Sequence, residues 1–500
     1  MTIDEAKDEV KNAVRAYLER DEAGQYEIPV EKQRPILLMG PPGIGKTAIM
    51  EQISHELGIG LVSYTITHHT RQSAIGLPKI SQKNYGDREY SVTEYTMSEI
   101  IGAVYDQIEL SGVKEGILFL DEINCVSETL APTMLQFLQY KTFGSHKLPE
   151  GYIIVTAGNP PQYNKSVRDF DIVTLDRVRQ INIEEDFESW KNYAYRAGVH
   201  GSILAYLEIK KDNFYSIKTD VNGRSFVTAR GWEDLSRIIK VYEKLGIEVD
   251  ENLTGQYLQN IDVARDFATY YELYKRYNEL YKIPEILEGR FPEDKKTIRQ
   301  DSFDEKLSII GLLTDKLMEE FRDYAKEQAV QKTLFETVKE GMACEKEGTI
   351  TAIGFGAWAA DKAGSMTQEL ESKKSAGMLD RDEEKEGVLA INALRECENF
   401  RTSEDAKKWF AERENLRQEK IKHTDDHLTN SFRFMEEVFG DEESLSGSQE
   451  MVIFITELSG AYHSLKFVRE AGNDAYYKYN KLLLLNDRKQ ELKDIAMKIV

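Results

Sequence analysis

The stretch ILLMGPPGIGKT, residues 36–47, decides the expected fold of this chain. Its first part, residues 36–39, is an apolar run of strand length, and residues 40–47 satisfy the pattern GxxxxGK[ST]. Apolar residues then recur at helical spacing over 49–57. A glycine-rich turn between a strand and a helix presents backbone N–H groups and the helix N-terminus to an anion. The sequence therefore predicts a phosphate-binding loop.

The side chains of this loop indicate a nucleoside triphosphate bound with magnesium. The glycines let the backbone curl around the phosphates, and Lys46 is placed to neutralise the β and γ oxygens. The hydroxyl of Thr47 is suited to ligate Mg²⁺. We therefore expect ATP and Mg²⁺ as ligands, with a chance loop match as the alternative.

A second motif, ILFLDE at residues 117–122, is an apolar strand that ends in two carboxylates. Successive strand residues point in opposite directions, so one carboxylate can face the metal and the other the attacking water. We expect Asp121 to hold magnesium, directly or through water, and Glu122 to polarise the water that attacks the γ-phosphate. An acidic turn that caps a strand is the alternative. The predicted nucleotide-binding residues are Gly40, Pro41, Pro42, Gly43, Ile44, Gly45, Lys46, Thr47 and Asp121, and the predicted metal ligands are Thr47 and Asp121.

Short apolar runs, rich in β-branched residues, alternate with helical patterns in the first part of the chain. This alternation is typical of an α/β fold in which helices cover both faces of a parallel sheet. The expected strands are 36–39, 61–66, 117–120, 152–157 and 180–183.

Helical spacing dominates the rest of the chain. The sequence predicts an α/β nucleotide-binding domain over 1–185, a small helical lid over 186–250 and an all-α C-terminal region over 251–500. Within these domains the expected helices are 4–20, 256–282, 303–342, 386–437 and 450–498, and 366–387 is expected to be a mobile connection or a solvated helix.

Composition excludes several classes of protein. A formal net charge of -22 argues against nucleic acid as the main partner, since phosphate binding relies on clustered Lys and Arg. The three cysteines have no CxxC spacing, so neither a disulfide framework nor a structural zinc site is expected. The N-terminus lacks the apolar run of a signal peptide, and no apolar stretch approaches the length of a membrane span. We therefore expect a cytoplasmic protein.

A third motif follows in residues 152–160, YIIVTAGNP, a buried strand that ends in an amide. The three motifs, in this order, resemble those of the MoxR-like AAA+ ATPases, and the resemblance covers roughly residues 30–245. In that family an asparagine in this place is the first sensor and helps to position the lytic water, a role that the resemblance implies for Asn159. Without the family, an Asn before Pro160 is usually a turn residue.

Residues 175–178, LDRV, resemble the segment whose arginine reaches the ATP of the neighbouring subunit in this family. The resemblance assigns this finger to Arg177, because a guanidinium from outside stabilises charge on the transferring phosphoryl group. Arg168 and Arg179 are near enough to compete, and Val178 stands where the family often has an aromatic residue. An ordinary surface salt bridge remains the alternative for each arginine.

The segment 225–232, SFVTARGW, resembles the second-sensor region, where an arginine near a helix N-terminus touches the γ-phosphate of its own subunit. The resemblance implies this role for Arg230. Two further segments, 67–78 and 143–149, match the positions of the inserted helix and of the hairpin that the family places near its ring pore. Either segment is equally well explained as a solvent-exposed loop.

Together these features predict Mg-dependent ATP hydrolysis that drives remodelling or assembly of a partner protein by a homo-oligomer, a hexameric ring in the family. The resemblance implies a von Willebrand factor A domain protein as a client. Two other functions stay open, a nucleotide-regulated scaffold and an AAA+ nucleic-acid machine. In the predicted site the catalytic residues are Glu122, Asn159, Arg177 and Arg230.

Overall fold

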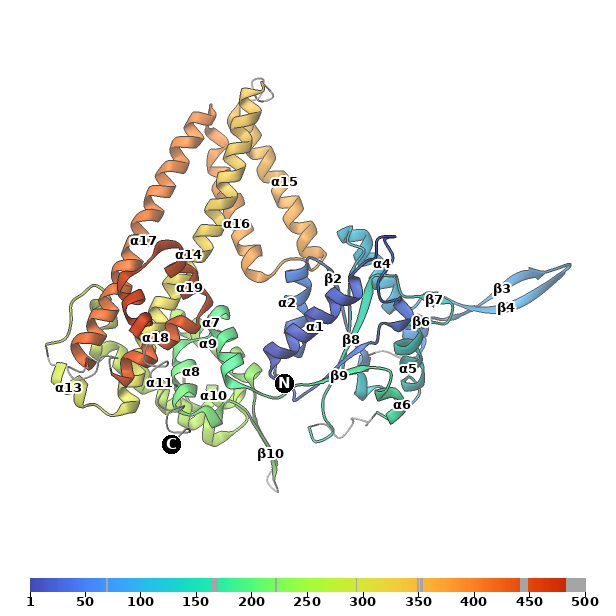
Figure 1. Ribbon diagram of the computed structural model, residues 1–500, viewed down its shortest axis with the longest axis horizontal. Coiled ribbons are helices and arrows are strands. Elements are labelled where there is room, and N and C mark those ends of the chain that lie inside the picture. The colour runs from blue at the N-terminus through green and yellow to red at the C-terminus, as the bar shows by residue number, and fades with distance from the viewer. Residues whose placement is uncertain are drawn as a thin grey trace, which may run out of the picture. The chain divides into compact units, whose positions relative to one another are not determined.

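The fold is seen in a computed structural model of the chain (Figure 1). The described residues are 1–68, 71–163, 170–220, 223–293, 295–348, 350, 354–440 and 448–482. They form two compact units, of which unit 1 comprises Met1–Asp186 with Ser365–Lys385, and unit 2 comprises Phe187–Gly364 with Glu386–Val500.

Unit 1 is built on a five-stranded sheet with the order β2-β5-β8-β1-β9. All four strand pairs are parallel, and Met39 at the end of β1 lies opposite Gly158 at the end of β8. The carboxyl ends of β1, β5 and β8 therefore share one edge, where α/β proteins bind ligands. The predicted parallel sheet is confirmed. Its strands are β1 (Ile36–Met39), β2 (Gly60–Thr65), β5 (Gly116–Asp121), β8 (Tyr152–Gly158) and β9 (Arg179–Asn182).

Helices flank this sheet and bury their apolar faces on it. The first begins with a capping box in which Thr2 and Glu5 each accept the other's backbone N–H. Its buried face consists of Ala6, Val10, Ala13 and Val14, close to the expected helix over 4–20. The helices of unit 1 are α1 (Ile3–Leu18), α2 (Lys46–Leu57), α3 (Arg71–Ile75), α4 (Glu99–Ser111), α5 (Ala131–Tyr140) and α6 (Ile172–Leu175).

Two antiparallel hairpins interrupt this α/β pattern. The longer one, β3 (Pro78–Tyr85) with β4 (Arg88–Tyr95), extends away from the sheet of its unit as a narrow arm (Figure 1). The segment 67–78 that precedes it contains the end of a 3-10 turn, the five-residue helix α3 and the first residue of β3, and residues 69–70 lie outside the described ranges. In the segment 143–149, β6 (Thr142–Phe143) and β7 (His146–Lys147) form a second, much shorter hairpin.

The first part of unit 2 packs around Trp232 and Phe267, which are both fully buried. The expectation that 186–250 is helical is wrong at one point, because an antiparallel hairpin lies between two of its helices. The sequence of this hairpin is mostly polar and gave no strand signal. These elements are α7 (Phe187–Ala197), α8 (Gly201–Ile209), β10 (Ser216–Asp220), β11 (Gly223–Val227), α9 (Ala229–Leu245), α10 (Glu251–Tyr257) and α11 (Ile261–Tyr281).

The remainder of the chain is largely helical, as predicted. Its longest helix, α14, has 44 residues and lies side by side with α17 (Figure 1). The single helix expected over 386–437 is wrong, because the chain leaves the helical path near Phe400 and a capping box at Thr402 starts a new helix. The helices are α12 (Ile283–Leu287), α13 (Lys295–Gln300), α14 (Phe303–Lys346), α15 (Phe355–Ser375), α16 (Arg381–Arg395), α17 (Ser403–Phe439), α18 (Gln449–Gly460) and α19 (Tyr462–Ala471), with a further helical stretch over 474–482.

Among the helices of the described ranges, none combines the length and the apolar character that crossing a membrane requires. The segment 366–387, for which a mobile connection or a solvated helix was expected, contains the end of α15 and the start of α16. Within unit 1 this segment contacts the α/β part, since Gln107 Nε2 donates a hydrogen bond of 2.5 Å to Ala376 O.

Candidate functional site

The glycine-rich loop joins the end of β1 to the start of α2. Gly43 and Gly45 have φ values of 75° and 99°, in the region that favours glycine, and Gly45 caps α2 without a side chain. The first backbone N–H groups of a 12-residue helix thus face the loop. Gly40 is needed for a different reason, because a Cβ there would stand 2.8 Å from Ile183 O. The loop therefore has the form of an anion-binding cradle.

The ammonium of Lys46 lies at the centre of this cradle. The residue is only 8% exposed. Its Nζ donates hydrogen bonds to Gly40 O at 2.9 Å, Pro41 O at 2.7 Å and Asn159 Oδ1 at 2.9 Å. All three of these acceptors are neutral oxygens, two from the loop itself and one from the third motif. The contact to Asn159 also joins the first and third sequence motifs, which are 113 positions apart.

The two acidic residues at the end of β5 take different positions. Thr47 Oγ1 lies 3.2 Å from Asp121 Oδ2, so the predicted metal ligands are brought together. Glu122 follows in the left-handed region with a φ of 56°, which turns its side chain away from the strand direction. Its Oε2 accepts a hydrogen bond of 2.9 Å from Thr67 Oγ1. The two carboxylates therefore have different partners, Thr47 for Asp121 and Thr67 for Glu122.

Sequence reasoning missed two residues of this site. Thr67 lies in the short 3-10 turn after β2, which pairs with β5, and its hydroxyl donates a hydrogen bond to Glu122. Asn124 donates from Nδ2 to Asn159 O at 2.8 Å and packs so tightly on Gly158 that a Cβ there would stand 2.6 Å from Asn124 Oδ1. A polar residue at the end of a strand is the only signal for Thr67, and the pairing of β2 with β5 is needed to use it.

The candidate finger residues differ in their surroundings. Arg177 is exposed, follows α6, and donates from Nη1 to Gln139 Oε1 at 2.7 Å. Arg179 lies on β9 and forms an ion pair with Glu9 of α1. Arg168 lies outside the described residues. Of the two described arginines, Arg177 is exposed and Arg179 is half-buried.

The segment before Arg177 is fixed by a helix cap. Asp171 caps α6, because its Oδ1 accepts a hydrogen bond of 2.7 Å from the backbone N–H of Thr174. Hydrogen bonding to Thr174 lowers the pKa of the Asp171 carboxyl, and the positive charge of Arg177 adds to this effect. The cap therefore fixes the start of α6, the helix that precedes Arg177.

Arg230 belongs to unit 2. It is the second residue of α9, whose N-cap Thr228 accepts the backbone N–H of Gly231 at 3.2 Å. The side chain is exposed, and within the described part of the chain it has no hydrogen-bond or ion-pair partner. The structure places Arg230 at a helix N-terminus, as the resemblance implied.

The oxygen donors of unit 1 fit a magnesium ion. Mg²⁺ takes hard oxygen ligands and usually binds through one or two carboxylates together with the phosphates of a substrate. Thr47 Oγ1 and Asp121 Oδ2 supply one hydroxyl and one carboxylate oxygen at 3.2 Å from each other, next to the phosphate loop. These two side chains are therefore suited to hold the metal of a nucleotide–metal complex.

Comparison with known proteins agrees with this geometry. Residues 36–175 match the family described as AAA, the ATPase family associated with various cellular activities. A search of curated proteins found no match to the chain. The matched range contains the phosphate loop, Asp121, Glu122 and Asn159. The chain thus carries an AAA ATPase domain of the P-loop NTPase superfamily and is an ATP hydrolase.

Proposed function

We propose that the chain uses ATP hydrolysis to remodel or assemble a partner protein, and that it works as a ring of identical subunits, six in the MoxR-like group that it resembles. The observation that carries this proposal is the convergence of Lys46 with Asn159 and of Thr47 with Asp121 at one edge of the sheet. AAA proteins are typically oligomeric, and their hydrolysis drives a mechanical or conformational change.

The residues of one subunit divide the work. Lys46 and the backbone of 40–47 bind the phosphates, while Thr47 and Asp121 hold the metal, which neutralises charge on the phosphate oxygens when it is bound. Glu122 polarises the attacking water by accepting its proton. Asn159, already directed at Lys46, orients that water relative to the γ-phosphate.

Two arginines complete the proposed site from outside the α/β part of the subunit that binds the ATP. Arg177 acts on the ATP of the neighbouring subunit, for which its exposed position on unit 1 is suited. Arg230 senses the γ-phosphate from the lid, proposed to span residues 186–250, so that hydrolysis changes the position of the lid. Residues 251–500 form the accessory region that would engage the partner or transmit the motion.

A protein partner is favoured by charge and by the β3–β4 arm. A net charge of -22 disfavours a nucleic acid. The arm presents large apolar side chains to solvent, with Ile80 at 76% and Tyr85 at 60% exposure. The ring of Tyr85 lies 6.0 Å from that of Tyr90, which is also exposed, and exposed apolar groups that lie together mark contact surfaces for proteins. A von Willebrand factor A domain protein in the cytoplasm is the client that the MoxR-like resemblance supports.

The proposed sharing of the site between subunits is tested by mixing two inactive variants. Arg177→Ala should lower the turnover number by about 10³-fold or more, and Glu122→Gln by about 10²- to 10⁴-fold. In a mixed oligomer, a site is active when its own subunit keeps Glu122 and the neighbouring subunit keeps Arg177. With equal amounts of the two variants each condition holds for one half of the subunits, so about one quarter of the sites are active. Recovery of ATP turnover on mixing is the expected result.

The matched control is Arg179→Ala, which removes a nearby arginine that is already paired with Glu9. Mixing Arg179→Ala with Glu122→Gln should add no activity beyond that of the Arg179→Ala sites themselves. If mixing Arg177→Ala with Glu122→Gln restores nothing, Arg177 does not act between subunits and the proposed arrangement is wrong.

The partner is tested with the Glu122→Gln chain in the presence of ATP. A motor should hold its client in the ATP state and lose its remodelling activity. A nucleotide-regulated scaffold should keep working, since it needs binding of ATP but not its hydrolysis. Turnover that rises on addition of DNA and falls steeply with salt would instead show a nucleic-acid machine.

A further inference from the structure

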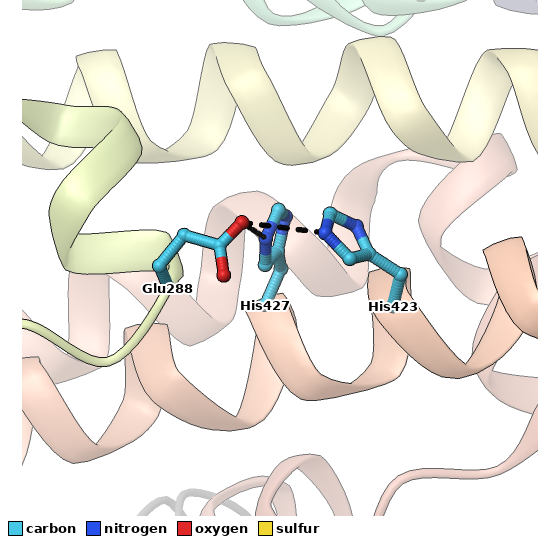
Figure 2. Close-up of side chains that lie close together, drawn as sticks. All are labelled: Glu288, His423 and His427. Carbon is cyan, nitrogen blue, oxygen red and sulfur yellow. Dashed lines mark ion pairs between the residues drawn. The ribbon is translucent and has the colours of Figure 1, made fainter.

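We propose that Glu288, His423 and His427 of unit 2 form a binding site for a divalent transition-metal ion, with Zn²⁺ as the ion that its ligands suit best (Figure 2). The site is separate from the nucleotide site and is built from residues of the C-terminal helical region. It goes beyond the ATPase function, and nothing in it depends on the nucleotide.

Two of the ligands come from one face of a helix. His423 and His427 are four residues apart on α17, so their side chains lie one turn apart on the same side. Their ring centroids are 4.0 Å from each other. Figure 2 shows both rings directed at the carboxylate of Glu288, which is the residue directly after α12. The cluster thus joins two segments that are 135 positions apart in the chain (423 minus 288).

The distances from Glu288 to the two histidines match those between ligands of a small tetrahedral ion. Glu288 Oε1 lies 3.3 Å from His423 Nε2 and 3.5 Å from His427 Nε2. Bonds of about 2.0 to 2.1 Å at tetrahedral angles separate neighbouring ligand atoms by about 3.3 to 3.4 Å. The three potential ligand atoms all lie within 4.8 Å of one another. The distances from Glu288 to both histidines are therefore those expected of ligands that share one ion.

A fourth residue prepares His427 as a ligand. Its Nδ1 lies 2.7 Å from Glu320 Oε1 on α14, so the carboxylate accepts the Nδ1 hydrogen and leaves the Nε2 lone pair free to bind a cation. The side chain of His427 is only 9% exposed. Within the described residues, its buried Nε2 makes no hydrogen bond. A buried ring nitrogen that is directed at a carboxylate without a hydrogen bond is the second sign of a ligand site.

The position of Glu288 is also fixed by the fold. Asn430 Nδ2 on α17 donates a hydrogen bond of 2.7 Å to Leu287 O, next to Glu288 in the chain. This bond holds the end of α12 against the helix that carries both histidines. Asn430 is thus a positioning residue for the site. The side chains of His423 and Glu288 are 57% and 45% exposed, so an ion can enter from solvent and keep water as a fourth ligand.

Ligand chemistry selects the ion. Two imidazole nitrogens and one carboxylate oxygen suit Zn²⁺, whereas Mg²⁺ and Ca²⁺ prefer oxygen ligands alone. A dication also balances the charges of Glu288 and Glu320, the two carboxylates that contact the histidines. A metal there would link α12 to α17 and, through Glu320, to α14.

A second group of similar composition in unit 1 serves as a contrast. His55, Asp380 and Glu383 also lie close together, but His55 Nε2 is 2.6 Å from Glu383 Oε2. That distance is an ordinary hydrogen bond and is too short for two ligands of one tetrahedral ion. Asp380 is also engaged, because its Oδ1 accepts the backbone N–H groups of Asp382 and Glu383 at 2.8 Å each. His55 therefore provides a matched control.

The test titrates ZnCl₂ into the metal-stripped full chain, in the presence of Mg²⁺ and a chromophoric chelator that competes for zinc. The expected result is one high-affinity zinc per chain. His423→Ala removes an exposed ligand and should weaken binding by about 100-fold or more, and Glu320→Gln by about 10- to 100-fold through the orientation of His427. His55→Ala should leave the affinity unchanged.

Cobalt provides a readout that a merely structural role would not change. Co²⁺ bound to the unmodified chain should show the strong visible absorption of four-coordinate cobalt, and Glu288→Gln should weaken or shift that absorption. Circular dichroism of each variant checks that it is folded. The proposal is overturned if the chain binds no zinc under these conditions, or if His423→Ala and Glu288→Gln bind zinc as tightly as the unmodified chain does.

Discussion

Replacing Lys141 with methionine is expected to stabilise unit 1 at neutral pH. Lys141 ends α5 and is only 5% exposed, and its Nζ donates a hydrogen bond of 3.2 Å to Gln33 Oε1. Burial lowers the pKa of its ammonium from 10.5 to about 8, although the charge of Glu31 opposes this change. At pH 7 the folded chain therefore carries a buried charge that the unfolded chain holds in water.

The size of the effect follows from this pKa. A difference of 2.5 (10.5 minus 8) corresponds to about 3 kcal/mol of folding free energy at about 1.36 kcal/mol per pH unit. Loss of the hydrogen bond to Gln33 lowers the free energy of unfolding by about 1 kcal/mol. Methionine fills a volume similar to that of lysine, so no cavity is created. The free energy of unfolding of Lys141→Met should thus exceed that of the unmodified chain by about 2 kcal/mol at pH 7.

The sign of the pH dependence is also fixed. Between pH 8 and 10.5 the unfolded Lys141 is protonated and the folded Lys141 is not, so the unfolded chain binds more protons and the stability of the unmodified chain rises with pH. The methionine variant lacks this rise. Its advantage should fall by about 1.4 kcal/mol per pH unit above pH 8 and be lost near pH 9.5.

The assay has to report unit 1 alone, since a chain of two units need not unfold in one step. All four tryptophans lie in unit 2, so their fluorescence does not report on unit 1. Urea titrations at pH 7.0 and pH 9.5, each followed by a short deuterium pulse at one fixed pH, can be read on peptides from β5 and β8. Lys114→Met, at an exposed position of the same unit, is the control and should show little change at either pH. A Lys141→Met chain that is less stable at pH 7, or whose advantage is the same at both pH values, would refute the reasoning.

Three further predictions concern the site and unit 2. Gly158→Ala should push the side chain of Asn124 off Asn159, which should lower the free energy of unfolding by about 1 to 3 kcal/mol and lower ATP turnover. Unchanged ATP turnover would contradict this role of the glycine. Thr67→Val should raise basal ATP turnover by up to about tenfold because it frees the carboxylate of Glu122, whereas Thr67→Ser should not, and a fall with valine would count against the idea. Lys191→Met should destabilise unit 2 by about 3 to 5 kcal/mol in urea titrations followed by tryptophan fluorescence, since it leaves the carboxylates of α8 and α18 that pair with it buried without a cation.

Local sequence was sufficient to predict the sheet and the phosphate loop. The strands of 36–39 and 117–120 are apolar throughout because both faces of a parallel sheet are covered, and such runs are easy to recognise. The observed strands β2 and β9 begin and end one residue earlier than expected. The loop was predictable because its glycines, lysine and threonine are adjacent in the chain.

Elements with a weak apolar pattern were missed. The β3–β4 arm is exposed on nearly all its residues, so no hydrophobic alternation marks its strands. The hairpin of β10 and β11 is mostly polar in sequence, so it gave no strand signal either. The break between α16 and α17 carries a start signal in Thr402 and Asp405, but the helical spacing on either side hid it.

The sequence by itself determined which chemical groups this protein has and which of them share a loop or a strand end, since backbone geometry fixes neighbours within a few residues. Only the tertiary structure decided which distant groups meet: Asn159 with Lys46, Thr67 with Glu122, and Glu288 with the two histidines of α17. The reason is physical, because strand order and helix packing are set by the burial of apolar side chains over the whole fold. Polar side chains outside the apolar core therefore meet their partners only because the helices and strands that bear them pack together.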